Sequence, residues 1–276
     1  MKILLLAFTA LSLTFAPTAA SAAYVFMTGT QNPWGLDASD AGSVEAPMVT
    51  IYGSGGYTRY QGFTASAFTL DNSFIYLDGS ERAGQELIDF LGANPTLIDN
   101  YINAGGRLYI NAALTWQPGA VLPIAFGLSL APGASVTGFN PMSFDSQALA
   151  QGGAGTSWTG LNGAYFSTHY VAGSPPNGTF SPILGTAGPN FLWTYSGAGG
   201  YLFVGAQTAP AFHSAGGIAL RTNELCLANG GPESVCGDII PPVPEPATWA
   251  MLIAGFGAIG GALRYRRQQA LPQPVI

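Results

Sequence analysis

Apolar runs of strand length divide the middle of the chain, and between two of them the apolar positions change to helical spacing. The runs lie at 24–27, 74–77 and within 107–111. Runs of this kind are typical of strands buried on both faces of a parallel sheet. Over 80–92 and 94–102 apolar residues recur every three to four positions, which predicts two helices. The pattern therefore predicts a strand–helix–helix–strand crossover, the unit of an α/β fold.

Polar residues and glycines set the expected ends of these two helices. Ser80 is placed to cap the first helix, and Gly92 to end it. Asn94 and Pro95 give the second helix a cap followed by a first-turn proline. The glycine pair at 105–106 stops that helix before the next strand.

Three further elements follow from local pattern. The run 49–52 predicts a short strand. The runs 191–195 and 201–206 are joined by the glycine-rich segment 196–200, which predicts an antiparallel hairpin.

The N-terminal apolar run has the form of a secretory signal peptide. Lys2 precedes an apolar stretch at 3–15, and Ala20 and Ala22 supply a small-residue cleavage site. The pattern predicts a signal helix over 1–22, removal by signal peptidase after Ala22, and export of the rest.

A second uncharged apolar run lies near the C-terminus, at 247–263. As a helix it would be about 25 Å long, near the lower limit for crossing a bilayer core of roughly 30 Å. Trp249 suits the headgroup layer at one end. Arginines close the other end and predict that it stays cytoplasmic: Arg264, Arg266 and Arg267.

The order of features around this run carries a resemblance to a known family. Pro244, Glu245 and Pro246 precede Trp249, a Gly255-Phe256-Gly257 run follows, and the arginines close the segment. This order resembles the PEP-CTERM sorting signal of Gram-negative bacteria. The resemblance implies recognition at 244–246 by an exosortase, a membrane protease-transpeptidase. It also implies removal of the tail and delivery to the cell envelope, the surface or an exopolysaccharide matrix. The alternative is an ordinary membrane anchor that is never cut.

The exported part is acidic. Between the two signals it carries four arginines, at 59, 82, 107 and 221, and all the acidic residues except Glu245, giving 4 − 13 = −9. This charge excludes binding to nucleic acid through its phosphates. It suits a soluble module in a polysaccharide gel. No cofactor is predicted, because the one GxGxxG pattern, at 255–260, lies in the membrane run with no strand before it.

The expected organisation is a signal peptide at 1–22, one exported domain at 23–230, a linker at 231–243, the sorting signal at 244–267 and a cytoplasmic tail at 268–276. Cys226 and Cys236 are the only cysteines and favour one disulfide in an oxidising compartment. A metal pair is the alternative, but two thiols without further ligands make a poor site, so no metal is predicted.

A second resemblance concerns the exported domain. The segments 77–80, 98–101 and 104–113, with 200–205 and 212–228, resemble class I glutamine amidotransferase-like domains. The resemblance implies a three-layer, flavodoxin-like fold with a mostly parallel sheet. Those enzymes place a cysteine after the central strand, where this chain has 111–114, Asn-Ala-Ala-Leu. The resemblance therefore implies a non-catalytic member.

Candidate catalytic groups are few, and none is assigned. His213 and Ser214 with Asp78 would make a hydrolase triad, but Ser214 is equally placed to cap a helix and no Gly-x-Ser-x-Gly elbow occurs. Asp78, Glu81 and Glu86 would make a carboxylate site at the end of a strand. The alternative for Glu81 and Glu86 is solvated acids in the first turn of a helix.

Aromatic residues offer a sugar-stacking platform, with core packing as the alternative. The candidates are Trp34, Trp116, Trp158, Trp193, Tyr165 and Tyr170. The sequence thus favours a non-catalytic exported protein sorted by its tail. A carbohydrate-binding module is the second hypothesis, and an envelope hydrolase the third.

Overall fold

The computed structural model describes residues 23–31, 44–136, 140–141, 167–174, 179–185, 190–197, 199–210 and 217–229. The predicted signal helix, the linker and the apolar C-terminal run lie outside these residues. Within them, no helix combines the length and the apolar character needed to cross a membrane.

An eight-stranded sheet forms the centre of the fold, in the order β2-β1-β3-β4-β11-β10-β9-β7. The first five of these strands run parallel, and the last three add on in antiparallel fashion. The parallel strands are β1 (Ala23–Thr28), β2 (Thr58–Gln61), β3 (Asn72–Asp78), β4 (Arg107–Asn111) and β11 (Gly200–Gly205). The antiparallel strands are β7 (Asn140–Pro141), β9 (Thr179–Gly185) and β10 (Asn190–Gly197).

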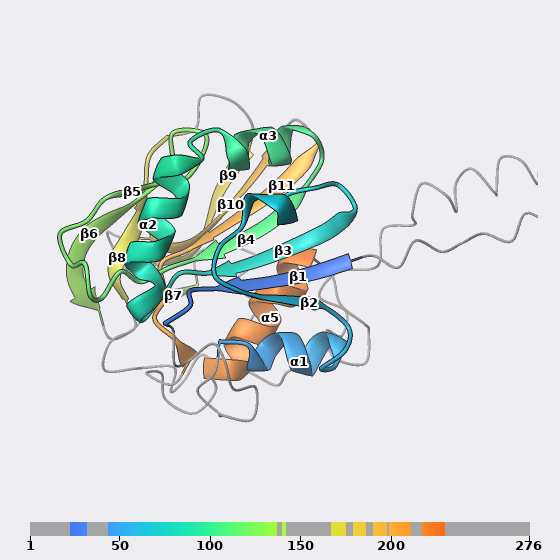
Figure 1. Cartoon of the computed structure of the whole chain (residues 1–276). Coiled ribbons are helices and arrows are strands. Elements are labelled where there is room, and N and C mark those ends of the chain that lie inside the picture. The colour runs from blue at the N-terminus through green and yellow to red at the C-terminus, as the bar shows by residue number, and fades with distance from the viewer. Residues whose placement is uncertain are drawn as a thin grey trace, which may run out of the picture.

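Helices lie on both faces of this sheet (Figure 1). On one side are α2 (Gly84–Ala93) and α3 (Leu97–Asn103), and on the other are α1 (Ala46–Tyr52) and α5 (Gly217–Asn229). Short 3-10 turns, η1 (Ala65–Ala67) and η2 (Glu81–Ala83), precede β3 and α2. The predicted α/β class with a mostly parallel sheet is confirmed.

Alternating side chains give the two faces of the sheet different cores. Ile75 and Leu77 of β3 point to the α2–α3 side with other aliphatic residues. Phe74 and Tyr76 of the same strand point to the α1–α5 side, where rings dominate. Strands buried on both faces are what the uninterrupted apolar runs predict.

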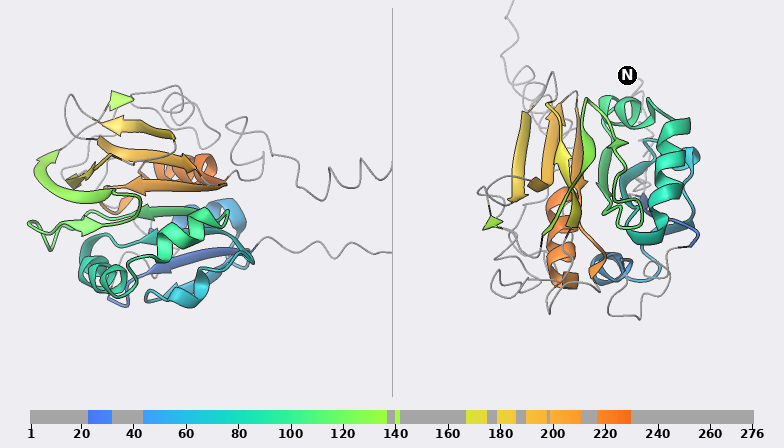
Figure 2. Two further views of the ribbon diagram at one scale, coloured as in Figure 1. Left: turned by 90° about the horizontal axis from the view of Figure 1, so that it is seen from above. Right: turned by 90° about the vertical axis from the view of Figure 1, so that its left-hand side faces the viewer.

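A small antiparallel sheet, β5-β6-β8, shares the aliphatic core and lies beside α2 (Figures 1 and 2). Its strands are β5 (Leu122–Pro123), β6 (Ser129–Val136) and β8 (Ser167–Ala172). The sequence did not predict this second sheet. The predicted hairpin is confirmed as β10 and β11, with Leu192 opposite Gly205.

The predicted strand at 49–52 is wrong, because these residues end helix α1. A proline in the first turn suits a helix start, and Met48 and Ile51 point together into the core. Spacing of three along one helix face outweighs the strand preference of a short β-branched run.

The expected helix caps are also corrected. Ser80 precedes η2, but its hydroxyl makes no capping bond and donates instead to the Gln207 carbonyl at 3.1 Å. Helix α2 runs one residue past Gly92, to Ala93, and α3 begins at Leu97 after Thr96 rather than at Asn94. Asn94 does not cap α3, because its side-chain amide donates to the Phe90 carbonyl at 2.8 Å.

Candidate functional site

The carboxyl ends of the parallel strands meet at one edge of the sheet. Asp78 at the end of β3 lies opposite Asn111 at the end of β4, and Asn111 lies opposite Gly205 of β11. Ligand sites of open α/β sheets lie outside this edge. Two polar clusters occur here, one toward α5 and one beside α2.

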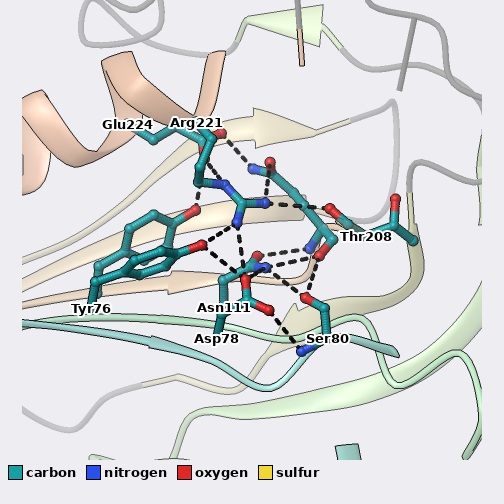
Figure 3. Close-up of polar contacts among 9 residues, drawn as sticks. Tyr76, Asp78, Ser80, Asn111, Thr208, Arg221 and Glu224 are labelled. Atoms are coloured by element: carbon teal, nitrogen blue, oxygen red, sulfur yellow. Dashed lines mark hydrogen bonds and ion pairs between the residues drawn. The ribbon is translucent and has the colours of Figure 1, made fainter. Parts of the chain in front are cut away.

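The first cluster is centred on Arg221 of α5, and Figure 3 shows its contacts. Its Nη1 donates to the Tyr76 hydroxyl at 2.7 Å and to Asp78 Oδ2 at 3.1 Å. Its Nε donates to Glu224 Oε2 at 2.9 Å. The guanidinium thus joins two carboxylates from different elements, and we call the group the Arg221 network. Its members are Tyr76, Asp78, Ser80, Tyr109, Asn111, Gln207, Thr208, Arg221 and Glu224.

Further hydrogen bonds satisfy the two carboxylates. Tyr109 donates its hydroxyl to Glu224 Oε2 at 2.7 Å, and the Gln207 amide donates to Oε1 at 2.6 Å. Tyr76 donates to Asp78 Oδ2 at 2.9 Å, and the main chain of Ser80 donates to Oδ1 at 3.0 Å. Every member of the network is at most 1% exposed.

Burial dominates the acid–base behaviour of the network. It raises the pKa of Glu224, with Arg221 and the three hydrogen bonds acting in the opposite direction. It also raises the pKa of Tyr76 and Tyr109 well above the usual range, so both remain neutral donors. A buried charge needs partners of this kind, because an unpaired one would be strongly destabilising.

Asn111 occupies the end of β4 and is fully buried. Its amide donates to Asp78 Oδ2 at 2.9 Å and to Ser80 Oγ at 3.0 Å, and its Oδ1 accepts the Gln207 main-chain N–H at 3.0 Å. These bonds tie the ends of β3, β4 and β11 together. The residue fastens strands and offers no nucleophile.

The second cluster contains Glu81, directly after β3. Glu81 is 3% exposed, so the alternative of a solvated acid is wrong for this residue. Burial raises its pKa from an ordinary 4.5 to about 7, with the charge of Asp78 acting in the same direction. Hydrogen bonds from the Ala209 main chain, the Thr115 hydroxyl and the Trp116 side chain lower it in part.

Glu81 also has a strained backbone, with φ of 57°. A non-glycine residue in this left-handed region costs about 1 to 2 kcal/mol. The neighbouring Arg82 places its guanidinium carbon 5.3 Å from the centroid of the Trp116 ring. Trp116 is 61% exposed. We call Glu81, Arg82 and Trp116 the Trp116 cluster.

Between β1 and β3, residues of the chain itself fill the edge of the sheet. Gly29 packs so closely on η2 that a Cβ there would lie 2.6 Å from the Ala83 Cβ. Thr30 donates its main-chain N–H and its hydroxyl to the Glu86 carboxylate, at 2.8 and 2.5 Å. Glu86 is therefore a partner of the β1 loop, and it does not meet Glu81 in a carboxylate pair.

Other polar and aromatic residues of interest lie away from these clusters. His169 is buried, with Nε2 3.1 Å from the Ala120 carbonyl, and burial lowers its pKa. Cys226 is buried and disulfide-bonded, while its predicted partner Cys236 lies outside the described residues. Tyr170 is half-buried, and for Trp193 only the strand position is described.

The remaining predicted residues lie outside the described part of the chain, so those predictions stay untested by the fold. They are Ala20, Ala22, Trp34, Trp158, Tyr165, His213, Ser214, Pro244, Glu245, Pro246, Trp249, Gly255, Phe256, Gly257, Arg264, Arg266 and Arg267. Among the described residues, no group of His, Cys, Asp and Glu is arranged to hold a metal ion.

Sequence reasoning missed Arg221, Glu224 and Gln207. One signal was available: the chain places one of its few arginines three residues before a glutamate in an otherwise mostly uncharged helix. Charges in such a helix are paired when they are buried.

Comparison with known proteins decides the nature of the C-terminal segment. Residues 242–267 match the model of the PEP-CTERM protein-sorting motif. The chain carries a PEP-CTERM sorting signal. This motif implies export and sorting to the cell envelope or surface by an exosortase, a membrane protease, and the predicted sorting signal is confirmed.

No curated protein matches the sequence. Similar solved structures include a cold-adapted β-galactosidase from Rahnella sp. R3, at 11% identity and TM-score 0.40, over 74% of this chain and 31% of that one. Agd3, a carbohydrate deacetylase, gives 8% identity and TM-score 0.36, over 68% of this chain and 30% of that one. A ThuA-like protein from Parabacteroides merdae gives 13% identity and TM-score 0.35, over 81% of this chain and 93% of that one.

The chain thus spans less than a third of the first two of these proteins. All three TM-scores are below 0.5, so these likenesses carry no argument about function. The resemblance to amidotransferase-like domains stays a prediction.

Proposed function

We propose that this chain is a non-catalytic exported protein that an exosortase cuts at 244–246 and releases to the cell surface or an exopolysaccharide matrix. The single observation that carries the sorting is the PEP-CTERM motif at 242–267. The predicted signal peptide at 1–22 supplies the export step that precedes it.

The proposed lack of catalysis is supported by the Arg221 network. Asp78 and Glu224 are carboxylates at the edge of the sheet, and both are inaccessible to solvent. Their oxygens are already bonded to Arg221 and its neighbours. A general acid or base must reach its substrate within hydrogen-bond distance, and these two carboxylates are buried among their protein partners.

We further propose that the exported domain is flavodoxin-type. Counted along the chain, its five parallel strands stand in the order 2-1-3-4-5, which is the order of that fold. In that fold ligands bind at the switch point between the first and third strands. Here Gly29, Thr30 and Glu86 fill that place, which supports a domain without a nucleotide cofactor.

The test of sorting changes Glu245 to Ala in the full-length chain. We expect a longer, membrane-held form to accumulate, because the acidic residue between the two prolines is lost from the recognition motif. Glu233→Ala is the matched control, since it removes the same charge outside the motif. Immunoblots of membrane and surface fractions give the result. Equal processing of Glu245→Ala and the parent chain would contradict the proposal.

A further inference from the structure

Trp116 is exposed yet held in place. It lies in the segment that follows β4, at the carboxyl end of the parallel strands, and 61% of its surface is accessible. The guanidinium carbon of Arg82 lies over this ring, 5.3 Å from the centroid, and hydrogen bonding to the Trp116 side chain is one of the influences that lower the pKa of the buried Glu81 carboxyl. The indole N–H is the only donor that this side chain has. An exposed ring fixed at both its face and its polar edge is a preformed contact surface.

Arg82 is available to a ligand as well as to the ring. Among the described residues, the ion pairs of arginine are those of Arg59 with Glu45 and of Arg221 with Asp78 and Glu224. Arg82 has no carboxylate within salt-bridge distance in that part of the chain. Its five N–H groups lie in one plane, and the interaction that the described residues give it is the one with the Trp116 ring.

Backbone strain points to the same place. Glu81 keeps a left-handed conformation that it would avoid without compensation, and residues held in this way cluster at binding and active sites. Its carboxylate connects Ala209, after β11, with Thr115 and Trp116, after β4. The strained residue thus fixes the segment that carries the exposed ring.

A flat aromatic surface beside a planar set of hydrogen-bond donors matches the chemistry of a pyranose. The C–H groups on one face of the sugar pack on an indole, and neighbouring hydroxyls accept from a guanidinium. We propose that Trp116 and Arg82 form a binding subsite for one pyranose unit of an uncharged polysaccharide, with Glu81 as the positioning residue.

The charge of the exported part favours a neutral polysaccharide over an acidic one as the ligand. The exported part carries −9, so an anionic polysaccharide would be repelled by the body around a single exposed guanidinium. A neutral polymer meets no such repulsion. The inference rests on the proposed function, because delivery by the sorting signal is what brings the site to surface polysaccharide.

The test is affinity electrophoresis of the full-length chain in mild detergent, through gels that contain dextran, β-glucan or galactomannan as neutral probes and alginate as the acidic probe. We expect at least one neutral polymer to retard the parent chain. Trp116→Ala should raise the dissociation constant at least tenfold, and Trp116→Phe should restore most of the binding. Leu70→Ala, which trims a side chain that is 60% exposed elsewhere, is the matched control and should bind like the parent.

Three results would overturn the inference: no retardation by any neutral probe, equal binding by Trp116→Ala and the parent, or binding to alginate alone.

Glu81→Gln tests whether Glu81 positions the Trp116 ring or only contributes to the stability of the fold. It should move the pH profile of Trp116 fluorescence, because the carboxyl beside the indole no longer titrates, and an unchanged profile would remove the role given to Glu81. Processing of the tail is measured separately in each variant. A loss of sugar binding with normal processing would count against the subsite alone, and a loss of processing with normal sugar binding would count against the sorting proposal alone.

Discussion

Two arginine–aromatic pairs lie at the same edge of the sheet and differ in access to water. Arg221 lies 5.8 Å from the Tyr109 ring in a network that is at most 1% exposed, while Arg82 lies 5.3 Å from the exposed ring of Trp116. In the first pair two buried carboxylates bind the guanidinium; in the second, described residues offer it none. The same residue types therefore serve stability when they are enclosed, and are available for recognition when they are left open.

The largest effect that tests this comparison is expected from Arg221→Met. It removes the cation that Asp78 and Glu224 share and leaves both carboxylates buried, which typically costs about 3 to 5 kcal/mol of unfolding free energy. Urea unfolding of the full-length chain in mild detergent measures it. A loss below about 1 kcal/mol would show that the network does not hold α5 to the sheet.

The next effect is a pH dependence at Glu81. Its folded-state pKa of about 7 is higher than its ordinary 4.5, so the folded chain binds the proton more tightly. This contribution to stability is present at low pH and is lost as the pH rises from about 4.5 to above 7. One pKa unit corresponds to about 1.4 kcal/mol. Between pH 4 and pH 8 the unfolding free energy of the parent should therefore fall by about 2 to 3 kcal/mol relative to that of Glu81→Gln.

The measurement for Glu81 is urea unfolding of both chains across that pH range. Asp78 is the charged group that faces Glu81 from β3, and it is the same in the two chains, so the difference between them isolates Glu81. If the difference in unfolding free energy between the parent and Glu81→Gln stays constant with pH, Glu81 is not a buried carboxyl with a raised pKa.

The smallest stability effect is expected from Arg82→Met, the counterpart of Arg221→Met. Exposed cation–π pairs contribute about 0.5 to 1 kcal/mol, so the unfolding free energy should change by no more than that. The same urea series measures it. A loss above about 2 kcal/mol would mean that Arg82 has a structural role like that of Arg221, and the comparison would fail.

Sequence pattern predicted the parts of the fold that depend on nearby residues. The crossover from β3 to β4 was found because its strands are continuous apolar runs and its helices keep a helical spacing. The hairpin of β10 and β11 was found from its glycine-rich turn. Helix α1 was missed, because the first-turn proline was outweighed by a β-branched run.

The candidate site was predicted only in part, because its contacts are between residues far apart in the chain. Tyr76 and Arg221 are 145 residues apart and are joined by one hydrogen bond. Glu81 was interpreted as a solvated acid, since acids in a first helical turn usually face water. Its left-handed backbone, which directs the side chain toward Ala209 and Thr115, has no local signature. Trp116 was among the aromatic candidates, but its exposure required the fold.

The most direct test of the account is mass spectrometry of the C-terminus of the protein recovered from surface and inner-membrane fractions of the cells. We expect a mature form in the surface fraction that ends at or near 244–246 and lacks every peptide from the apolar run at 247–263. A chain that keeps this run and its arginines up to Ile276, held in the inner membrane, would contradict it.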